Sequence, residues 1–143
     1  TRKIREEKTG ICKNFTRLPE SVKKRLTIEN DDKESMYSVK DLMFIYEKIG
    51  IPIVFDYHHH KFCSGSLTEK EALKLALSTW PKDIIPVVHY SESKSIHEND
   101  QKIKPQAHSD YIKKIPNTYD MDIDIMVEAK AKELSIIPFI NSF

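Results

Sequence analysis

Four short runs rich in apolar residues, each followed at once by an acidic residue or a histidine, constrain the fold of this chain more than any other feature. The runs are residues 25–28 before Glu29, 51–55 before Asp56, 84–88 before His89 and 123–127 before Glu128. Short segments that are apolar at most positions are typical of parallel strands, which are buried on both faces. The sequence therefore predicts four buried strands, each with a polar residue at its carboxyl end.

Segments with helical spacing of apolar residues alternate with these runs. They cover residues 3–17, 38–49, 68–80 and 128–136, with a shorter one near 109–115. Ser38 and Gly50 are boundary signals for the second segment, and Thr68 with Glu71 forms a capping box at the start of the third. Residues 91–107 are polar and indicate a long loop. Strand and helix in alternation predict parallel pairing through right-handed crossovers, with the helices covering the outer face.

Side chains alternate across a strand, so the polar end residues should share a face with the residues two positions earlier. Those residues are Thr27, Val54, Val87 and Met126. Carboxyl ends of parallel strands form the active-site face of a TIM barrel, but a complete barrel needs ~250 residues. Because the chain has 143 residues, we expect residues 1–143 to form a single domain that is the C-terminal half of an α/β TIM-type barrel.

Composition excludes several classes of protein. Hydrophobic residues make up 39% of the chain and only 3 residues are glycine, as in a globular domain. The 23 Lys and Arg against 22 Asp and Glu leave no basic footprint for nucleic acid. Cys12 and Cys63 form no CxxC pair, which favours a reducing compartment, and no apolar run approaches the ~20 residues that span a bilayer. We therefore expect no membrane partner.

One carboxylate and three imidazoles follow the second apolar run. Asp56 is separated by Tyr57 from His58, His59 and His60. A buried carboxylate without a partner is costly, so such a cluster at a strand end indicates metal ligation. Carboxylates and imidazoles suit manganese, whereas a structural zinc site would show thiolates. His97, within a charged loop, is expected to be a solvated residue.

Five blocks of sequence resemble the UV damage endonuclease family in order and spacing, and together they cover nearly the whole chain. The blocks are residues 26–32, 50–60, 89–91, 108–112 and 124–130. The resemblance implies a TIM barrel that holds a cluster of about two or three divalent ions, usually Mn²⁺, and nicks the DNA backbone 5′ to UV photoproducts. It also implies UV-damaged double-stranded DNA and the N-terminal half of the barrel as partners, and an intracellular location in the cytoplasm or nucleus.

Carried over residue by residue, the resemblance implies a specific set of metal ligands, through which catalysis would occur. They are Glu29, Asp56, His59, His89, His108 and Glu128. Asn30, Asp31 and Ser91 are placed to orient these ligands, and His60 is a neighbour with the same potential role. Val87 departs from the family, which carries a lysine there that is modified to a metal-bridging carbamate.

Two other interpretations stay open on the sequence alone. A metal-dependent sugar isomerase or epimerase of the same barrel class also places Glu, Asp and His at strand ends. An inactive half-barrel fragment is the third interpretation, because half a barrel leaves two strand edges and an apolar interior uncovered.

Overall fold

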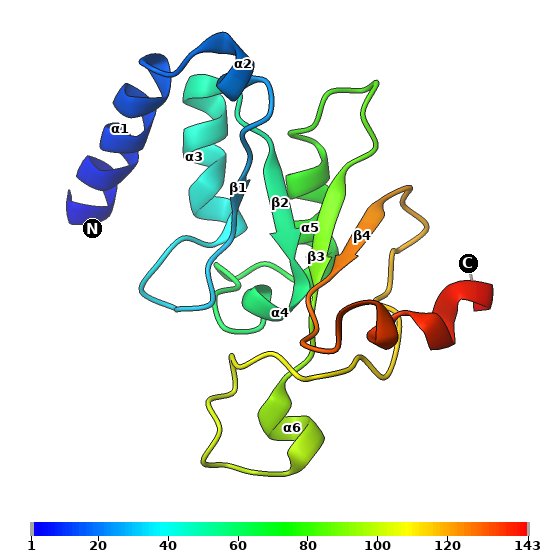
Figure 1. Ribbon diagram of the computed structural model, residues 1–143. Helices are drawn as coiled ribbons and strands as arrows, with labels where there is room; N and C mark the ends of the chain where they lie inside the picture. The colour runs from blue at the N-terminus through cyan, green and yellow to red at the C-terminus, as the bar shows by residue number, and fades with distance from the viewer. Residues whose placement is uncertain (1, 143) are drawn as a thin grey trace.

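The computed structural model describes residues 2–142 as a parallel sheet flanked by helices (Figure 1). The four strands follow the order β1-β2-β3-β4, and every neighbouring pair is parallel. The strands are β1 (Ile28–Glu29), β2 (Ile53–Asp56), β3 (Val87–Tyr90) and β4 (Asp124–Val127). Each strand pairs with the next along the chain, as in a segment of a (β/α) barrel. The predicted α/β fold with four parallel strands is confirmed.

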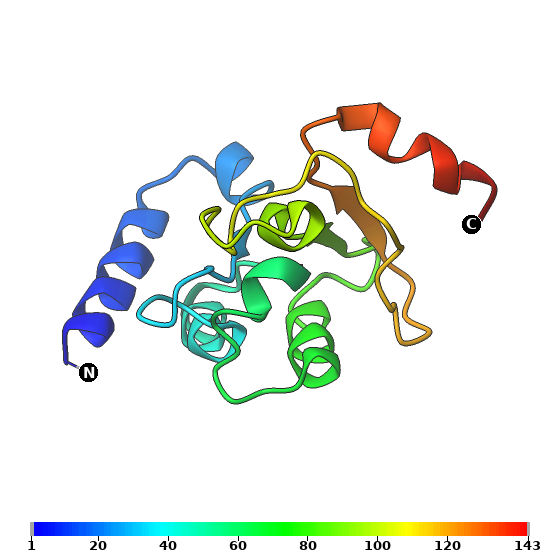
Figure 2. The same ribbon diagram turned by 90° about the horizontal axis from the view of Figure 1, so that it is seen from below.

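Two helices cover the outer face of this sheet. Figure 2 shows α3 and α5 on the same side of the strands. The helices are α1 (Arg2–Thr16), α2 (Glu20–Lys23), α3 (Val39–Ile49), α4 (Tyr57–His60), α5 (Glu69–Leu77) and α6 (Lys94–Glu98), followed by the 3-10 helices η1 (Lys132–Ser135) and η2 (Ile137–Ser142). Ile45 of α3 and Leu73 of α5 join Phe55 and Val88 of the strands in one buried core. None of the helices among residues 2–142 is long and apolar enough to cross a bilayer.

The opposite face of the sheet carries the residues predicted to point inward. Register pairs Glu29 with Val54, Asp56 with His89 and His89 with Met126, so these side chains share a face. Val54 is buried, but 53% of Met126 is exposed. The inner face therefore becomes open to solvent toward β4.

Helix boundaries follow the capping signals of the sequence. The Ser38 hydroxyl accepts a hydrogen bond from the Asp41 amide, and Thr68 and Glu71 form the expected capping box. Gly50 ends α3 with a φ of 68°, a left-handed conformation that glycine adopts without strain. These boundary predictions are confirmed; α3 precedes β2, and α5 follows it after the short helix α4.

Strand boundaries lie further along the chain than the apolar runs suggest. The amides of Arg25 and Leu26 donate to the carbonyl of Val22, and the amide of Ile84 donates to Pro81. Local turns therefore occupy the backbone at the start of these runs, and the strands begin later. Three strands also end later than the runs: Glu29 and Asp56 are the last residues of their strands and His89 lies within β3, whereas β4 ends at Val127, directly before Glu128.

The prediction of a helix over residues 68–80 is wrong at its end. α5 stops at Leu77, because the next residues bond to β2 instead of continuing the helix. The hydroxyl of Thr79 accepts the Ile53 amide at 2.8 Å, and the indole of Trp80 donates to the Ile53 carbonyl at 2.7 Å. These two bonds tie the end of α5 to the start of β2.

The helix predicted near residues 109–115 is also wrong, and only η1 forms within 128–136. Side chains take the amides that a helix would need: Ile112 donates to the Ser135 hydroxyl, and Lys113 and Lys114 donate to the Glu92 carboxylate. Within the expected loop over residues 91–107, the structure instead contains the short helix α6. Residues 112–114 in the long connection from β3 to β4 are therefore held by two side chains far away in the sequence, Glu92 near the start of the connection and Ser135 after β4.

Candidate metal centre

Asp56 occupies the corner between β2 and α4. Its Oδ1 accepts hydrogen bonds from the amides of His58 at 2.7 Å and His59 at 2.8 Å, so the carboxylate caps α4. The residue is 0% exposed, and its second oxygen, Oδ2, is buried without a hydrogen-bond partner. An unpaired buried carboxylate oxygen is costly. This oxygen is therefore suited to a bound cation.

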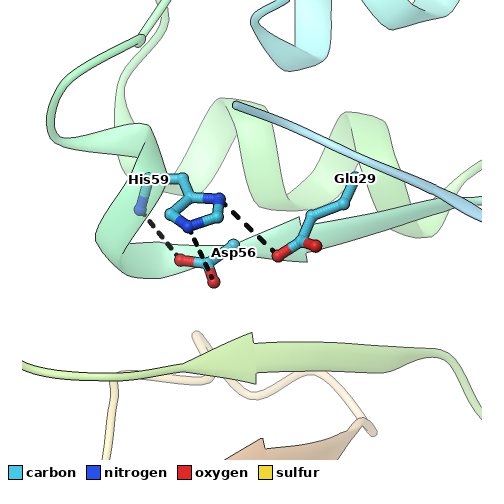
Figure 3. Close-up of side chains that lie close together, drawn as sticks. All are labelled: Glu29, Asp56 and His59. Atoms are coloured by element: carbon cyan, nitrogen blue, oxygen red, sulfur yellow. Dashed lines mark hydrogen bonds and ion pairs between the residues drawn. The ribbon is translucent and has the colours of Figure 1, made fainter. Parts of the chain in front are cut away.

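His59 presents one ring nitrogen to that oxygen. Its Nδ1 lies 2.8 Å from the backbone carbonyl of Asn30, which can only accept, so Nδ1 carries the proton. Nε2 then keeps its lone pair and lies 3.8 Å from Asp56 Oδ2. Figure 3 shows the His59 ring facing the Asp56 carboxylate, with Glu29 on its other side. Glu29 Oε1 approaches the same ring at 3.6 Å from Nδ1. The tautomer leaves His59 ready to ligate through Nε2.

Asn30 fixes both of these residues. Its side-chain oxygen accepts the Asp56 amide at 2.8 Å, and its side-chain nitrogen donates to the Asp56 carbonyl at 3.0 Å. The backbone carbonyl of Asn30 meanwhile orients His59. Outer partners of this kind set the orientation of metal ligands. The expected orienting role fits Asn30, whereas the buried Ser91 hydroxyl has no hydrogen-bond partner.

A second group of side chains adjoins the first across β3 and β4. His89 Nδ1 lies 3.0 Å from Glu29 Oε1 and 3.5 Å from Glu128 Oε1. His108 Nδ1 lies 3.7 Å from Glu128 Oε2. The structure thus brings all six residues of the predicted ligand set to one place, although their role as ligands remains a prediction.

Two triads within this set have donor atoms close enough to share a cation. In each triad the donor atoms lie within 4.8 Å of one another. The triads are Glu29 with Asp56 and His59, and Asp56 with His89 and Glu128. Asp56 belongs to both. Carboxylates and imidazoles are a donor set that suits Mn²⁺, so the residues present fit a divalent ion.

The electrostatics of the cluster also favour a cation. Burial raises the pKa of Asp56 to about 6, and the nearby Glu29 carboxylate adds to this effect. The pKa of His89 is raised because the ring hydrogen-bonds to Glu29. Burial opposes ionisation of Glu29 as well, but the bonds to His89 hold its pKa below the ordinary value. The carboxylates around His89 therefore attract positive charge, and without a metal this favours the protonated form of the His89 ring.

His97 is not the solvated residue that the sequence predicts. Its Nε2 pairs with the Glu92 carboxylate, and both side chains are largely buried. Glu92 also accepts hydrogen bonds from the Tyr90 hydroxyl and from the amides of Lys113 and Lys114. These bonds hold the pKa of Glu92 low although burial opposes ionisation. The sequence does not single out Glu92, because the amides of Lys113 and Lys114 that it binds lie more than 20 residues further along the chain.

The fold and the site define a class: a parallel α/β half-barrel with carboxylates and imidazoles gathered at the carboxyl ends of its strands. The family model described as UV-endonuclease UvdE matches residues 2–142, and the chain belongs to this family. The predicted family resemblance is thereby confirmed. The four strands among residues 2–142 do not by themselves close a barrel.

Relatives of known name agree with this assignment. The chain is 36% identical over 139 residues to a "UV DNA damage endonuclease" of Bacillus cereus (strain Q1), covering 90% of this chain and 41% of that protein. It is 39% identical over 130 residues to a "UV-damage endonuclease" of Schizosaccharomyces pombe, covering 87% of this chain and 21% of that protein. The chain therefore spans less than half the length of these relatives.

A solved structure has the same fold. The structure titled "Crystal Structure of SacUVDE" matches with a TM-score of 0.79 and 32% sequence identity. The match covers 97% of this chain and 46% of that one. The half-barrel architecture is consistent with this partial coverage.

Proposed function

We propose that this chain is the C-terminal half of a DNA repair endonuclease that nicks the DNA backbone 5′ to UV photoproducts. Its substrate is UV-damaged double-stranded DNA, and its location is intracellular, in the cytoplasm or the nucleus. The observation that carries the proposal is the buried, unpartnered Oδ2 of Asp56, surrounded by carboxylates and imidazoles in a member of this family. The sugar isomerase or epimerase alternative is not favoured, because the named relatives are UV damage endonucleases.

The proposed ligands bind one metal cluster from two sides. Divalent ions, which we propose to be Mn²⁺, would bind the scissile phosphate, lower the pKa of a water and stabilise the leaving oxygen. Asp56 and His59 hold one side of the cluster, and His89, His108 and Glu128 hold the other. Glu29 lies between His89 of β3 and His59 of α4. Asn30 keeps Asp56 and His59 oriented, so that these ligands need not reorganise on binding.

The rest of the barrel is proposed to come from an N-terminal half. In this proposal residues 1–143 are a single domain that makes up the C-terminal portion of the barrel. Met126, on the inner face of the sheet, is 53% exposed. The strand edges of β1 and β4 have no further strand partner among residues 2–142. Covering this face and both edges removes the exposed apolar surface and the unpaired backbone groups. An inactive half-barrel fragment is the outcome if no such half joins it.

Nicking of supercoiled plasmid tests the proposed function. The natural full-length gene product with Mn²⁺ is expected to nick UV-irradiated plasmid and to leave unirradiated plasmid intact. Glu29→Gln removes one carboxylate charge from the triad with Asp56 and His59. We expect it to reduce selective nicking by about 10-fold or more.

Two outcomes would contradict the proposal. Folded wild-type protein that binds Mn²⁺ but does not nick irradiated plasmid would reject the substrate. Equal nicking by wild type and Glu29→Gln would reject the proposed centre as its source.

Val87→Lys is expected to raise Mn²⁺ occupancy or nicking in the full-length protein. Val87 lies two residues before His89 on the same face of β3, and valine offers no metal ligand at the position where the family's lysine stands. A lysine there would restore a group able to carry the bridging carbamate. Metal content by mass spectrometry and the plasmid assay measure the effect. Unchanged values of both would reject this prediction.

A further inference from the structure

We propose that His58 is a positioning residue that holds the loop of His108 against the metal centre. Its Nε2 lies 3.2 Å from the backbone carbonyl of Gln106, two residues before His108. The carbonyl can only accept, so Nε2 donates this hydrogen bond. The proposal rests on the proposed function for its effect on metal binding, whereas its effect on the loop stands on the contact itself.

The surroundings of His58 show what the ring contributes. It is 0% exposed and packs edge-on against Phe62 and His108, with ring centroids 5.2 Å and 5.7 Å away. Its Nδ1 is buried without a hydrogen-bond partner. Leaving a buried polar atom unpaired costs about 1–3 kcal/mol. An apolar ring would avoid that cost, so the bond to Gln106 is the contribution that distinguishes histidine here.

The hydrogen bond from His58 ends at Gln106, beside residues 107 and 109, whose own backbone bonds go to the segment after β3. The Lys94 amide donates to the Ala107 carbonyl, and the Ser109 amide donates to the Glu92 carbonyl, each at 2.8 Å. These bonds fasten the loop to the segment after β3. His58, in contrast, lies in α4, close to the junction with β2 where Asp56 and His59 are also found.

His58 therefore couples the two sides of the centre. One side consists of Asp56 and His59, and the other includes His108 with Glu128. The rings of His59 and His108 have centroids 6.3 Å apart. A loop free to move away from the corner would separate His108 from the rest of the ligand set.

His60 supplies a matched control on the same helix. It is also a buried histidine with an unpartnered Nδ1, but its ring packs on Phe55 of β2 and bonds to the backbone of Leu67. These contacts lead away from the six proposed ligands, so they do not support the orienting role that the sequence suggests for His60. The same substitution at the two positions therefore removes a similar buried imidazole. The difference is where each ring bonds: His58 bonds to Gln106 in the loop of His108, whereas His60 bonds to the backbone of Leu67.

The test compares His58→Phe, His58→Gln and His60→Phe in the full-length protein. Hydrogen exchange of the Ala107 and Ser109 amides is measured without metal, and Mn²⁺ affinity by calorimetry. We expect His58→Phe to speed this exchange and to weaken part of the Mn²⁺ binding by about 10-fold or more. His58→Gln, whose amide can donate to Gln106, should restore both values, and His60→Phe should change neither.

Wild-type exchange and affinity in His58→Phe, or equal loosening in His60→Phe, would overturn the proposal. If His58→Phe does not fold, His58→Asn takes its place, because its shorter amide falls short of Gln106 while His58→Gln reaches it. If the wild type binds no Mn²⁺, the proposed function fails. The exchange comparison then decides the role of His58 without metal.

Discussion

Asp56→Asn is expected to reduce Mn²⁺-dependent nicking by more than about 100-fold while the fold is retained. Asp56 belongs to both triads of the candidate centre, so the loss should exceed the 10–100-fold typical of an outer partner. Asparagine caps helices about as well as aspartate, and its Oδ1 can still accept the amides of His58 and His59. The substitution therefore separates charge from structure.

The plasmid assay and circular dichroism measure these two properties of Asp56→Asn. Asp83→Asn is the control, since Asp83 is exposed and precedes β3 at the opposite edge of the sheet. Nicking by Asp56→Asn at the level of Asp83→Asn would show that Asp56 is not a ligand. Loss of the helical spectrum would show instead that its charge is needed for folding.

The same substitution should reverse its effect on stability when metal is removed. Burial raises the pKa of Asp56 to about 6, above its value in the unfolded chain. Its contribution to stability is therefore full below about pH 4 and is lost as the pH rises through about 6. Without metal at pH 7, Asp56→Asn should be more stable than wild type, and with Mn²⁺ it should be less stable.

Urea unfolding at pH 4 and pH 7, in chelator and in Mn²⁺, measures this difference. Comparison with the wild type at each pH measures Asp56 together with its influence on Glu29 and His89, because Asp56 contributes to the shifted pKa values of both. A difference between the two proteins that is independent of both pH and metal would contradict the expected titration.

Leu73→Ala is expected to lower the free energy of unfolding by about 2–5 kcal/mol, the usual cost of a large cavity in a core. Leu73 is 0% exposed on α5 and belongs to the core that supports the outer face of β2. Because β2 carries Asp56, a loosened core should also weaken Mn²⁺ binding.

Leu134→Ala is the matched control, because Leu134 of η1 is 55% exposed. We expect this change to stay within about 0.5 kcal/mol of the wild type. Urea unfolding of both full-length variants checks the prediction. Equal destabilisation at the two positions would mean that Leu73 of α5 does not pack in the core as the structure indicates.

The helix boundaries show which features local rules predict. Ser38, Gly50 and Thr68 act within one turn of their own position, through a hydroxyl that reaches three residues on or a left-handed φ. Local rules miss the end of α5, because Thr79 and Trp80 bond to Ile53 of β2 instead of continuing the helix. Such competition depends on contacts between distant segments.

The loop from β3 to β4 shows the same limit more strongly. Residues 109–115 have a helical pattern, but Glu92 and Ser135 take the amides of that segment. His97 has the local composition of a solvated residue and is instead paired with Glu92. The loss of the helix depends on residues more than 20 positions away, whereas the pairing of His97 depends on how the loop folds back on Glu92, five residues earlier.

The sequence by itself determined the parallel α/β half-barrel and the set of polar residues that its strand ends bring together. It could do so because side chains alternate along a strand and neighbouring parallel strands end at one edge. Only the tertiary structure decided that Asp56 Oδ2 is left unpaired, that Nε2 of His59 keeps its lone pair, and that His58 reaches Gln106. These features depend on which groups from distant segments lie close together in space. The periodicity of residues along the chain does not specify those contacts.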